Sequence, residues 1–522
     1  MRLYHNVKFK KSLTRIIQEK LVIISSLFIS FLFYGIYLNT HFSTDSYSYM
    51  ISHNVINHHL ELGRFVPALG LYLMQNFQIE PIQSQFIFTF INIIVFSILS
   101  IFTYLKFTNR NCENESERKI GMLKKNLLIY KLLIYLGVLT IFFNAYFIDW
   151  FVWAESSIFF SIAITLAVLA GFEVVHNKRS RLRNYFISTI ILIFALGTNQ
   201  AMGTYFFIIC LTIIYLDFIQ ENQIKKTIFD ILLTGFVYAT SAMSQIILLL
   251  IFRPARQDFS KVDIFVNLKK IIAFIPDIIL RSYTFLPRYF YASATLVLII
   301  SFLAFLVFLT KGRRIILFLI SFVIMCIINI AIFAPHIISS DLWITPRTVV
   351  GIMGWPGILT IWIAFLIQLD NGNWLHIKKL LYPIVCSIVV VFLFTNYFYT
   401  QKIALGTQIT NHMDRELTNI IYTKIQTYET RSGIVVNNLS FINDGSISWA
   451  YNDLISSSDT NVREFAVGWG RTPMFNLYTG RNFKEIPMVK DINDKYFIGK
   501  SWTSYSEDQI VIIGDTAYIA VY

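Results

Sequence analysis

Long apolar runs alternate along the chain with short polar or basic segments. Many runs hold about 20 residues, the length that an α-helix needs to cross the hydrocarbon core of a bilayer. The pattern predicts an all-α polytopic membrane protein of about eleven spans. The expected spans are 21–38, 85–105, a third that ends near 144, a fourth that begins near 157, then 185–197, 202–219, 228–252, 294–311, 315–333, 349–368 and 381–398.

Basic residues occupy alternate loops between these spans, at 106–125, 176–184, 225–226, 311–314 and 378–379. Cytoplasmic loops are enriched in Lys and Arg, so we expect these loops and the basic N-terminus to lie in the cytoplasm. The basic segment 253–293 breaks the pattern, because it falls on the expected outer side. We interpret its apolar stretches as helices that lie on the membrane surface. The chain after 398 is then expected to emerge outside.

Composition excludes two other classes of protein. The chain is 55% hydrophobic and only 14% charged, with a mean hydropathy of +0.58, so a soluble globular enzyme is ruled out. With 48 Phe and 28 Tyr it cannot be a disordered chain. The net charge of +13 fits basic cytoplasmic loops better than a nucleic-acid partner. The four cysteines form no disulfide framework.

The composition becomes that of an ordinary soluble domain after residue 398, which divides the chain into 1–398 and 399–522. Apolar residues at helical spacing predict an amphipathic helix that ends at Ser432-Gly433. Short β-prone runs follow at Ile434–Val436, Phe465–Val467 and Ile510–Ile513, with turn signals at Asp444-Gly445 and Gly514-Asp515. These features predict a small α/β domain on the outer face.

Common catalytic signatures are missing from the sequence. It has no GxxxxGK[ST], GxGxxG, HExxH or CxxC motif, so nothing indicates ATP-driven transport or nucleotide binding. No motif indicates a divalent metal or another cofactor. The spacing of His53, His58 and His59 matches no metal cluster, and a polar loop helix explains it.

The first expected outer loop holds an acid and an arginine close to the membrane surface. Asp45 can act as a general base on an incoming hydroxyl, or Ser43, Thr44 and Asp45 can cap a helix. Arg64 can bind a phosphate through two hydrogen bonds, or its side chain can lie along the membrane–water interface beside Phe65. Both alternatives stay open at this stage.

Three further arginines, Arg281, Arg288 and Arg347, lie on the expected outer side and are candidate phosphate contacts.

A second outer loop combines acids with aromatic residues. Asp149 and Glu155 flank Trp150 and Trp153, and such a set can bind a sugar. An aromatic belt at the membrane interface also explains the tryptophans. The acids are harder to explain that way, because carboxylates near the hydrocarbon are costly and are commonly functional.

Two other segments are candidates for sugar or acceptor binding. Asn199 and Gln200 lie between two expected spans and can line a polar cavity or pair across helices. In the C-terminal segment, Trp469 and Arg471 lie in a Gly/Pro-rich loop that suits sugar binding, or that is an ordinary turn.

Together these segments resemble the GT-C superfamily of polytopic glycosyltransferases, which use a polyprenyl-phosphate-linked sugar. The likeness is greatest to the Gtr-type O-antigen glucosyltransferases. It rests on the basic N-terminus, Asp45-Ser46-Tyr47-Ser48, Gly63-Arg64-Phe65-Val66-Pro67, the outer acids, Asn199-Gln200-Ala201 and the exported C-terminal domain. The family often has two adjacent acids in the first loop, where this chain has only Asp45.

The resemblance implies an inverting hexosyltransferase of the bacterial cytoplasmic membrane. Undecaprenyl-phosphate-linked glucose or a similar hexose would be the donor, and a hydroxyl of a lipid-linked surface polysaccharide the acceptor. Asp45 would be the catalytic base, with Asp149 or Glu155 sharing the role, and Arg64, Arg347 or Arg288 would hold the phosphate. Membrane lipid and the synthase and flippase that supply the donor would be its partners, and no nucleic acid is involved.

Two other classes remain as alternatives. A polysaccharide polymerase or ligase is also polytopic with large outer loops, and it uses diphosphate-linked glycans. A lipid-sugar flippase or other transporter commonly places charged groups near the bilayer midplane, whereas the spans here look nearly free of charge at their centres.

Overall fold

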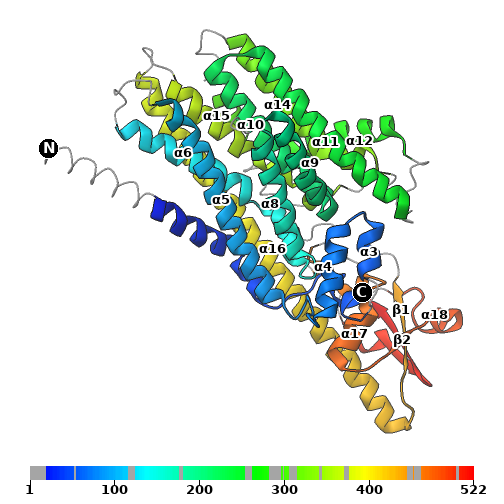
Figure 1. Cartoon of the computed structure of the whole chain (residues 1–522). Coiled ribbons are helices and arrows are strands. Elements are labelled where there is room, and N and C mark those ends of the chain that lie inside the picture. The colour runs from blue at the N-terminus through cyan, green and yellow to red at the C-terminus, as the bar shows by residue number, and fades with distance from the viewer. Residues whose placement is uncertain are drawn as a thin grey trace.

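A long helical bundle carries a small mixed domain at one end, as the computed structural model shows (Figure 1). The structure describes residues 19–51, 55–115, 124–175, 180–252, 262–280, 295–297, 299–304, 314–339, 342, 344–369, 375–443, 451, 460–500, 502 and 505–521. A first helical segment, Glu19–Leu38, opens this part of the chain. The bundle helices that follow are α2 (Ser46–Ile51), α3 (Val55–Glu61), α4 (Phe65–Asn76), α5 (Gln85–Glu115), α6 (Lys124–Phe142), α7 (Ile148–Val152), α8 (Ser157–Val174), α9 (Arg181–Thr198), α10 (Gly203–Glu221), α11 (Ile224–Phe252), α12 (Ile264–Leu280), α14 (Arg314–Ile337), α15 (Trp355–Leu369) and α16 (Leu375–Ser432).

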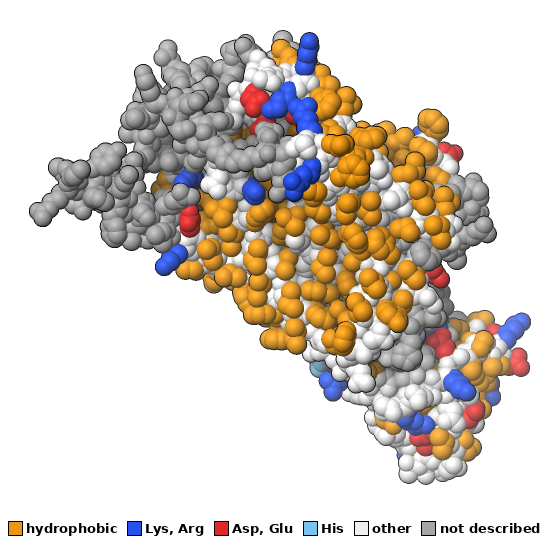
Figure 2. Space-filling view, in the orientation of Figure 1, with side chains coloured by type: hydrophobic (Ala, Val, Ile, Leu, Met, Phe, Trp, Pro, Cys, Tyr) orange, Lys and Arg blue, Asp and Glu red, His pale blue; other side chains and the backbone are white. Residues whose placement is uncertain are grey.

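Nine helical segments in the described ranges are long and apolar enough to cross a membrane, so the chain is a multi-pass membrane protein. They are Glu19–Leu38, Gln85–Asn109, Leu128–Val152, Ser157–Val174, Gln200–Glu221, Ile224–Ile251, Ile316–Ile337, Val350–Gln368 and Leu381–Ser432. The space-filling view shows a broad hydrophobic surface across the middle of the visible face of the bundle (Figure 2).

The difference from the predicted eleven spans concerns two segments. The expected span 185–197 is helix α9, which has 18 residues and begins with Arg181, Arg183 and Asn184, so its mean hydropathy is low. The expected span 294–311 corresponds to the short apolar helix Thr295–Ala304, and residues 305–313 lie outside the described part of the chain.

Helices α10 and α15 form the centre of the bundle. Nearly every side chain of α10 is buried, because α8, α11, α14 and α15 all pack around it. The Trp362 ring of α15 lies 4.2 Å from that of Tyr215 on α10. Helices α6 and α15 lie close together at Gly137 and Gly357, where a side chain on Gly357 would collide with the Gly137 carbonyl. Small residues allow such close helix contacts inside membranes.

The two ends of the bundle differ in charge. Lys106, Arg181, Arg183, Lys225 and Lys226 lie on the ends of helices α5, α9 and α11 that are farthest from the C-terminal domain. Figure 2 shows Lys and Arg side chains gathered at that end. The distribution has the form that the positive-inside rule describes.

Helix α16 joins the membrane part to the C-terminal domain without a break. It has 58 residues, so the expected division after residue 398 falls inside a continuous helix. The helix ends at Ser432 as the sequence predicts, and Gly433 follows with φ +70°, a left-handed conformation that favours glycine. The first C-terminal helix is therefore the extension of the last span.

The C-terminal domain is a mixed four-stranded sheet with two short helices, α17 (Arg471–Thr479) and α18 (Lys490–Tyr496). Its strands are β1 (Asn438–Asn443), β2 (Lys484–Glu485), β3 (Ile510–Ile513) and β4 (Thr516–Val521), in the order β2-β1-β4-β3. Strands β1 and β4 are parallel, with Asn438 opposite Thr516, and β3 and β4 form an antiparallel hairpin. Leu417, Ile421 and Ile425 of α16 complete the core of the domain.

Of the three predicted strands, only Ile510–Ile513 is confirmed, together with its turn at Gly514-Asp515. Residues Ile434–Val436 precede strand β1, which begins at Asn438. Phe465–Val467 is not a strand, because a 3₁₀ turn occupies Glu464–Ala466 and the Glu464 amide donates to Asp414 Oδ2 over 3.0 Å. The predicted turn at Asp444-Gly445 lies outside the described residues.

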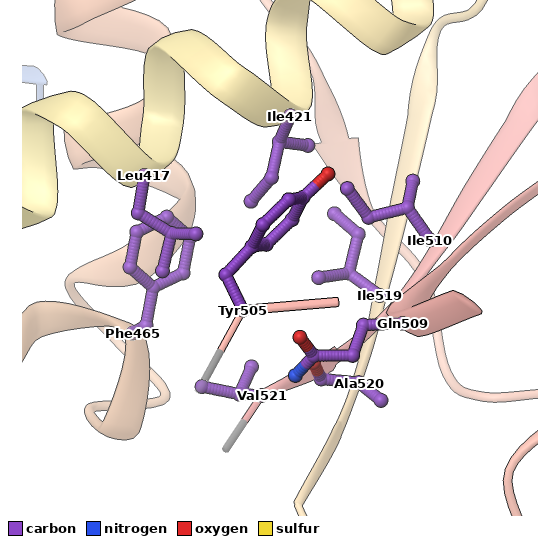
Figure 3. Close-up of a pocket in the computed structure, with 9 residues that line it drawn as sticks. All are labelled: Leu417, Ile421, Phe465, Tyr505, Gln509, Ile510, Ile519, Ala520 and Val521. Atoms are coloured by element: carbon purple, nitrogen blue, oxygen red, sulfur yellow. The ribbon is translucent and has the colours of Figure 1, made fainter. Parts of the chain in front are cut away.

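A small apolar cavity lies between α16 and the sheet (Figure 3). Leu417 and Ile421 line it from the helix, and Tyr505 and Ile519 from the side of the sheet. The cavity offers almost no polar group for a ligand, so it belongs to the packing of the domain.

Candidate functional site

The first loop after Glu19–Leu38 begins the candidate site at the end of the bundle that carries the C-terminal domain. Ser43 caps helix α2: its Oγ lies 3.3 Å from the Ser46 amide, and the Ser43 amide donates to Ser46 Oγ over 3.0 Å. Of the three possible caps in the sequence, Ser43, Thr44 and Asp45, it is Ser43 that forms this reciprocal cap. The Asp45 side chain instead points towards the C-terminal domain.

Asp45 meets Trp469, which comes from the loop before α17. The indole Nε1 of Trp469 donates a hydrogen bond to Asp45 Oδ1 over 2.9 Å. Ser48 Oγ donates to the Trp469 carbonyl over 2.9 Å, and the hydroxyls of Tyr47 and Tyr478 lie 2.8 Å apart. Helix α2 is thereby bound to the C-terminal domain, and Trp469 keeps 60% of its surface exposed beside the carboxylate.

Glu155 approaches the same loop from the membrane part. It lies between α7 and α8 and is only 2% exposed, and its Oε2 accepts a hydrogen bond of 3.1 Å from Ser46 Oγ. Burial, and then the nearby charge of Asp45, raise the pKa of Glu155 to about 8, although Ser46 and Arg347 act in the opposite direction. Glu155 is therefore mostly protonated at neutral pH.

Arg347 lies in a 3₁₀ turn, Pro346–Thr348, that precedes α15 and packs against α7. The hydroxyl of Thr348 accepts from the Thr345 amide over 3.0 Å and fixes the turn. The guanidinium lies 4.5 Å from the ring centre of Trp153 and is buried. Trp153 is a predicted sugar contact. In the structure its ring makes a cation–π contact with Arg347, which is a candidate phosphate-binding residue.

Arg64 lies at the tight turn between α3 and α4. Gly63 takes φ +70°, and the Arg64 amide donates to the His59 carbonyl over 2.8 Å. The Phe65 ring lies against Gly197, where a side chain would collide with it. Burial, and then the like charge of Arg347, lower the pKa of Arg64 to about 10, so the guanidinium stays charged at neutral pH. The Arg64 Nε atom is enclosed and has no hydrogen-bond partner in the described part of the chain.

These contacts bring six predicted site residues together: Asp45, Arg64, Trp153, Glu155, Arg347 and Trp469. The acids and the arginines are close enough for their charges to act on one another, which is not apparent from positions up to 302 residues apart. With Glu155 protonated, the two guanidinium groups of Arg64 and Arg347 outnumber the carboxylate of Asp45. The cluster therefore has a positive charge that an anionic ligand can neutralise.

Glu464 is a further acid of the site that the sequence analysis missed. It is 2% exposed, and a side chain on Gly470 would collide with its carboxylate. Burial, and then the charges of Asp414 and Asp45, raise the pKa of Glu464 well above its ordinary value. A small polar cavity beside it is lined by Ser43, Thr44, Thr407, Asn411 and Asn461, among others. The only sequence signal was an acid directly before the apolar Phe465–Val467.

The other predicted residues have separate positions. Asp149 is buried in α7, where its charge acts on Tyr37 and Tyr146. Asn199 caps its own turn by accepting from the Ala201 amide over 3.0 Å. Gln200 donates to the Leu62 carbonyl over 3.0 Å and so supports the turn that carries Arg64.

Arg471 does not join the cluster in the structure. Arg471 pairs with Glu485 inside the C-terminal domain and lies 4.7 Å from the Phe441 ring centre. Arg288 and Arg281 lie outside the described residues. The described residues also contain no group of three or more His, Cys, Asp or Glu side chains that could hold a metal ion.

Comparison of the chain with protein-family models, curated proteins and solved structures gives no match. The case for a function therefore rests on the chain's own residues.

Proposed function

We propose that the protein is a membrane glycosyltransferase that moves a hexose from a polyprenyl phosphate to a hydroxyl of a lipid-linked glycan. The observation that carries the proposal is the cluster around Asp45. A carboxylate held by Trp469 lies next to two enclosed arginines and a neutral acid, at one end of an apolar bundle. A base and a phosphate-binding site near a membrane surface are the two elements that such a transfer requires.

We assign the role of general base to Asp45. The neighbouring acids are weaker candidates, because burial raises the pKa of Glu155 to about 8, which keeps it mostly protonated at neutral pH, and raises the pKa of Glu464 well above its ordinary value. A protonated carboxyl group cannot remove a proton from the acceptor. The hydrogen bond from Trp469 orients the Asp45 carboxylate without neutralising it.

The transfer is a single displacement with inversion. The acceptor oxygen forms a bond to the anomeric carbon while its proton passes to Asp45. The bond between that carbon and the phosphate oxygen breaks, and its electron pair stays on the phosphate. Arg64 and Arg347 stabilise this growing negative charge, which is the largest electrostatic demand of the reaction.

Charge distribution supports the sidedness of the proposal. The basic end of the bundle lies opposite the cluster, and under the positive-inside rule this supports a cytoplasmic location for that end and an outer location for the cluster. We propose the bacterial cytoplasmic membrane as the location, with undecaprenyl-phosphate-linked glucose as the donor. The exposed Trp469 ring is a surface on which an acceptor sugar can stack beside Asp45.

The test is transfer by the purified full chain in detergent, with undecaprenyl-phosphate glucose and a lipid-linked glycan. Wild type is expected to add one hexose, seen by mass spectrometry. Asp45→Asn is expected to lose transfer by about 100-fold or more. Asp491→Asn, at an exposed position of α18, is the matched control and should keep full activity.

Two outcomes would replace the proposal. Transfer only from a diphosphate-linked glycan would indicate a polymerase or ligase. Absence of transfer in detergent, together with movement of the lipid-linked sugar across reconstituted vesicles, would indicate a flippase. Full transfer by Asp45→Asn would remove Asp45 from the role of base.

A further inference from the structure

His59 on helix α3 is a buried histidine without an evident structural role. It is 2% exposed, and neither ring nitrogen has a hydrogen-bond partner among the residues that the structure describes. His41 is equally buried, yet its Nδ1 lies 2.8 Å from the Asn39 carbonyl and its Nε2 lies 2.9 Å from the Phe151 carbonyl. The hydrogen bonds of His41 hold its loop against helix α7, whereas the His59 ring has no such bonds among the described residues.

The surroundings of His59 connect it to the candidate site. Its carbonyl accepts from the Arg64 amide over 2.8 Å, so the two residues are fixed to one another. Burial, then the charge of Arg64 and that of His58, hold the pKa of His59 well below its ordinary value. The imidazole is therefore neutral and offers one N–H donor and one nitrogen acceptor.

The His59 ring and the Arg64 Nε atom are thus two enclosed groups that lack partners in the described part of the chain, and they are close enough for the Arg64 charge to act on His59. Buried polar groups are nearly always hydrogen-bonded, because leaving one without a partner costs free energy. Both groups can donate a hydrogen bond, and Arg64 adds a positive charge. A ligand with several anionic oxygens satisfies both at once.

We propose that His59 is a further donor-binding residue, whose neutral imidazole donates a hydrogen bond to a phosphate oxygen of the polyprenyl phosphate that Arg64 holds. This inference rests on the proposed function and names one more contact of the same site. A neutral donor suits this position, because a third positive charge beside Arg64 and Arg347 would be repelled by both. When the bond to the sugar breaks and the phosphate gains charge, the hydrogen bond strengthens.

The experiment measures lipid binding, so it needs neither sugar nor acceptor. The purified full chain is heated in detergent with undecaprenyl phosphate, with undecaprenol and with inorganic phosphate, and the shift in melting temperature gives the affinity. His59→Phe removes both ring nitrogens and keeps an aromatic ring. His59→Asn restores a donor, Arg64→Gln removes the charge, and His412→Phe makes the same change at an exposed position.

Wild type is expected to bind undecaprenyl phosphate more tightly than undecaprenol. His59→Phe should bind the phosphate lipid about ten-fold more weakly, with binding of the alcohol unchanged. His59→Asn should recover part of the loss, and His412→Phe should behave as wild type. Each shift is taken against the same variant without lipid, so a change in stability alone does not alter the result. Competition by inorganic phosphate would show that the phosphate group is sufficient for binding without the polyprenyl tail of the lipid.

Equal binding of the phosphate lipid by His59→Phe and wild type would overturn the inference. If Arg64→Gln still loses binding in that case, the arginine site and the proposed function stand. Equal binding of phosphate lipid and alcohol by wild type would also overturn it. If His59→Phe loses binding of the phosphate lipid selectively while wild type transfers no sugar, that result would support the phosphate-binding site and contradict the proposed transferase function.

Discussion

The indole of Trp469 donates a 2.9 Å hydrogen bond to the carboxylate of Asp45, 424 positions earlier in the chain. Asp45 directly precedes helix α2 beside the membrane part, and Trp469 precedes α17 in the C-terminal domain. The candidate base is thus oriented by a domain that contributes no membrane span. The proposed sugar transfer should therefore depend on the position of the C-terminal domain relative to the membrane part.

Replacing Trp469 by Phe should separate the hydrogen bond from the aromatic ring. The variant keeps the stacking surface but loses the donor to Asp45, and a hydrogen bond to a charged group is worth about 1.5–3 kcal/mol. We expect sugar transfer to fall by about 10-fold or more, as measured with purified protein. Trp502→Phe removes a similar indole bond of 3.1 Å, to Asp508, and should leave transfer unchanged. Equal activity of the two variants would contradict the role of Trp469.

Replacing Glu155 by Gln should flatten the dependence of stability on pH. The pKa of Glu155 is raised in the folded state to about 8, from an ordinary value of 4.5, so the folded chain binds this proton more tightly than the unfolded chain. Its contribution to stability is complete below pH 4.5 and is lost as the pH rises to about 8. Wild type should lose about 1 to 3 kcal/mol more than Glu155→Gln between pH 5 and 8.

Thermal unfolding at a series of pH values measures this difference. Glu416→Gln changes an exposed glutamate on α16 and should follow the wild-type curve. Parallel curves for wild type and Glu155→Gln would show that Glu155 is ionised throughout.

A methyl group on Gly470 should weaken the junction between the two parts of the protein. An alanine Cβ there would collide with the Glu464 carboxylate and lie 3.0 Å from the Thr44 carbonyl oxygen. We expect a destabilisation of about 1 to 3 kcal/mol, together with faster proteolysis of the C-terminal domain. Gly468→Ala meets no atom within 4 Å and is the control. Similar proteolysis rates for the two variants would argue against close packing at Gly470.

Arg347→Lys keeps the positive charge and should still impair the site. Lysine cannot form the planar stack on Trp153 or a two-pronged contact with phosphate. We expect transfer to fall by about 10-fold, with a weaker apparent affinity for the donor lipid. Arg181→Lys alters a comparable arginine, 4.7 Å from the Phe229 ring centre at the far end of the bundle, and should have no effect on transfer.

The sequence was most informative about the membrane part, because hydrophobicity is a local property and each span carries its own signal. Helix α9 shows the limit of that signal, since Arg181 and Arg183 lower its hydropathy although it packs within the bundle. The acids and arginines of the outer loops could be chosen as candidates because charge near a membrane is costly.

The arrangement of the site could not be predicted, because it depends on contacts between distant segments. Nothing in the sequence pairs Ser46 with Glu155 or places Trp469 beside Asp45. His59 was considered as a metal ligand and explained as part of a polar loop helix, since the sequence alone does not show which histidine lacks partners among the described residues. Phe465–Val467 was predicted as a strand from its local preference, which the bond from Glu464 to Asp414 overrides.

Because helix α16 is uninterrupted, the number of its residues fixes both the distance and the rotation of the C-terminal domain relative to the membrane part. Its 58 residues correspond to about 87 Å at 1.5 Å per residue. Inserting one residue in the stretch between the bundle and the domain would turn everything beyond it by about 100° and carry Trp469 away from Asp45. Substitutions on the exposed side of that stretch leave this rotation intact, whereas insertions and deletions do not. Change in chain length here is therefore restricted far more strongly than change in residue type.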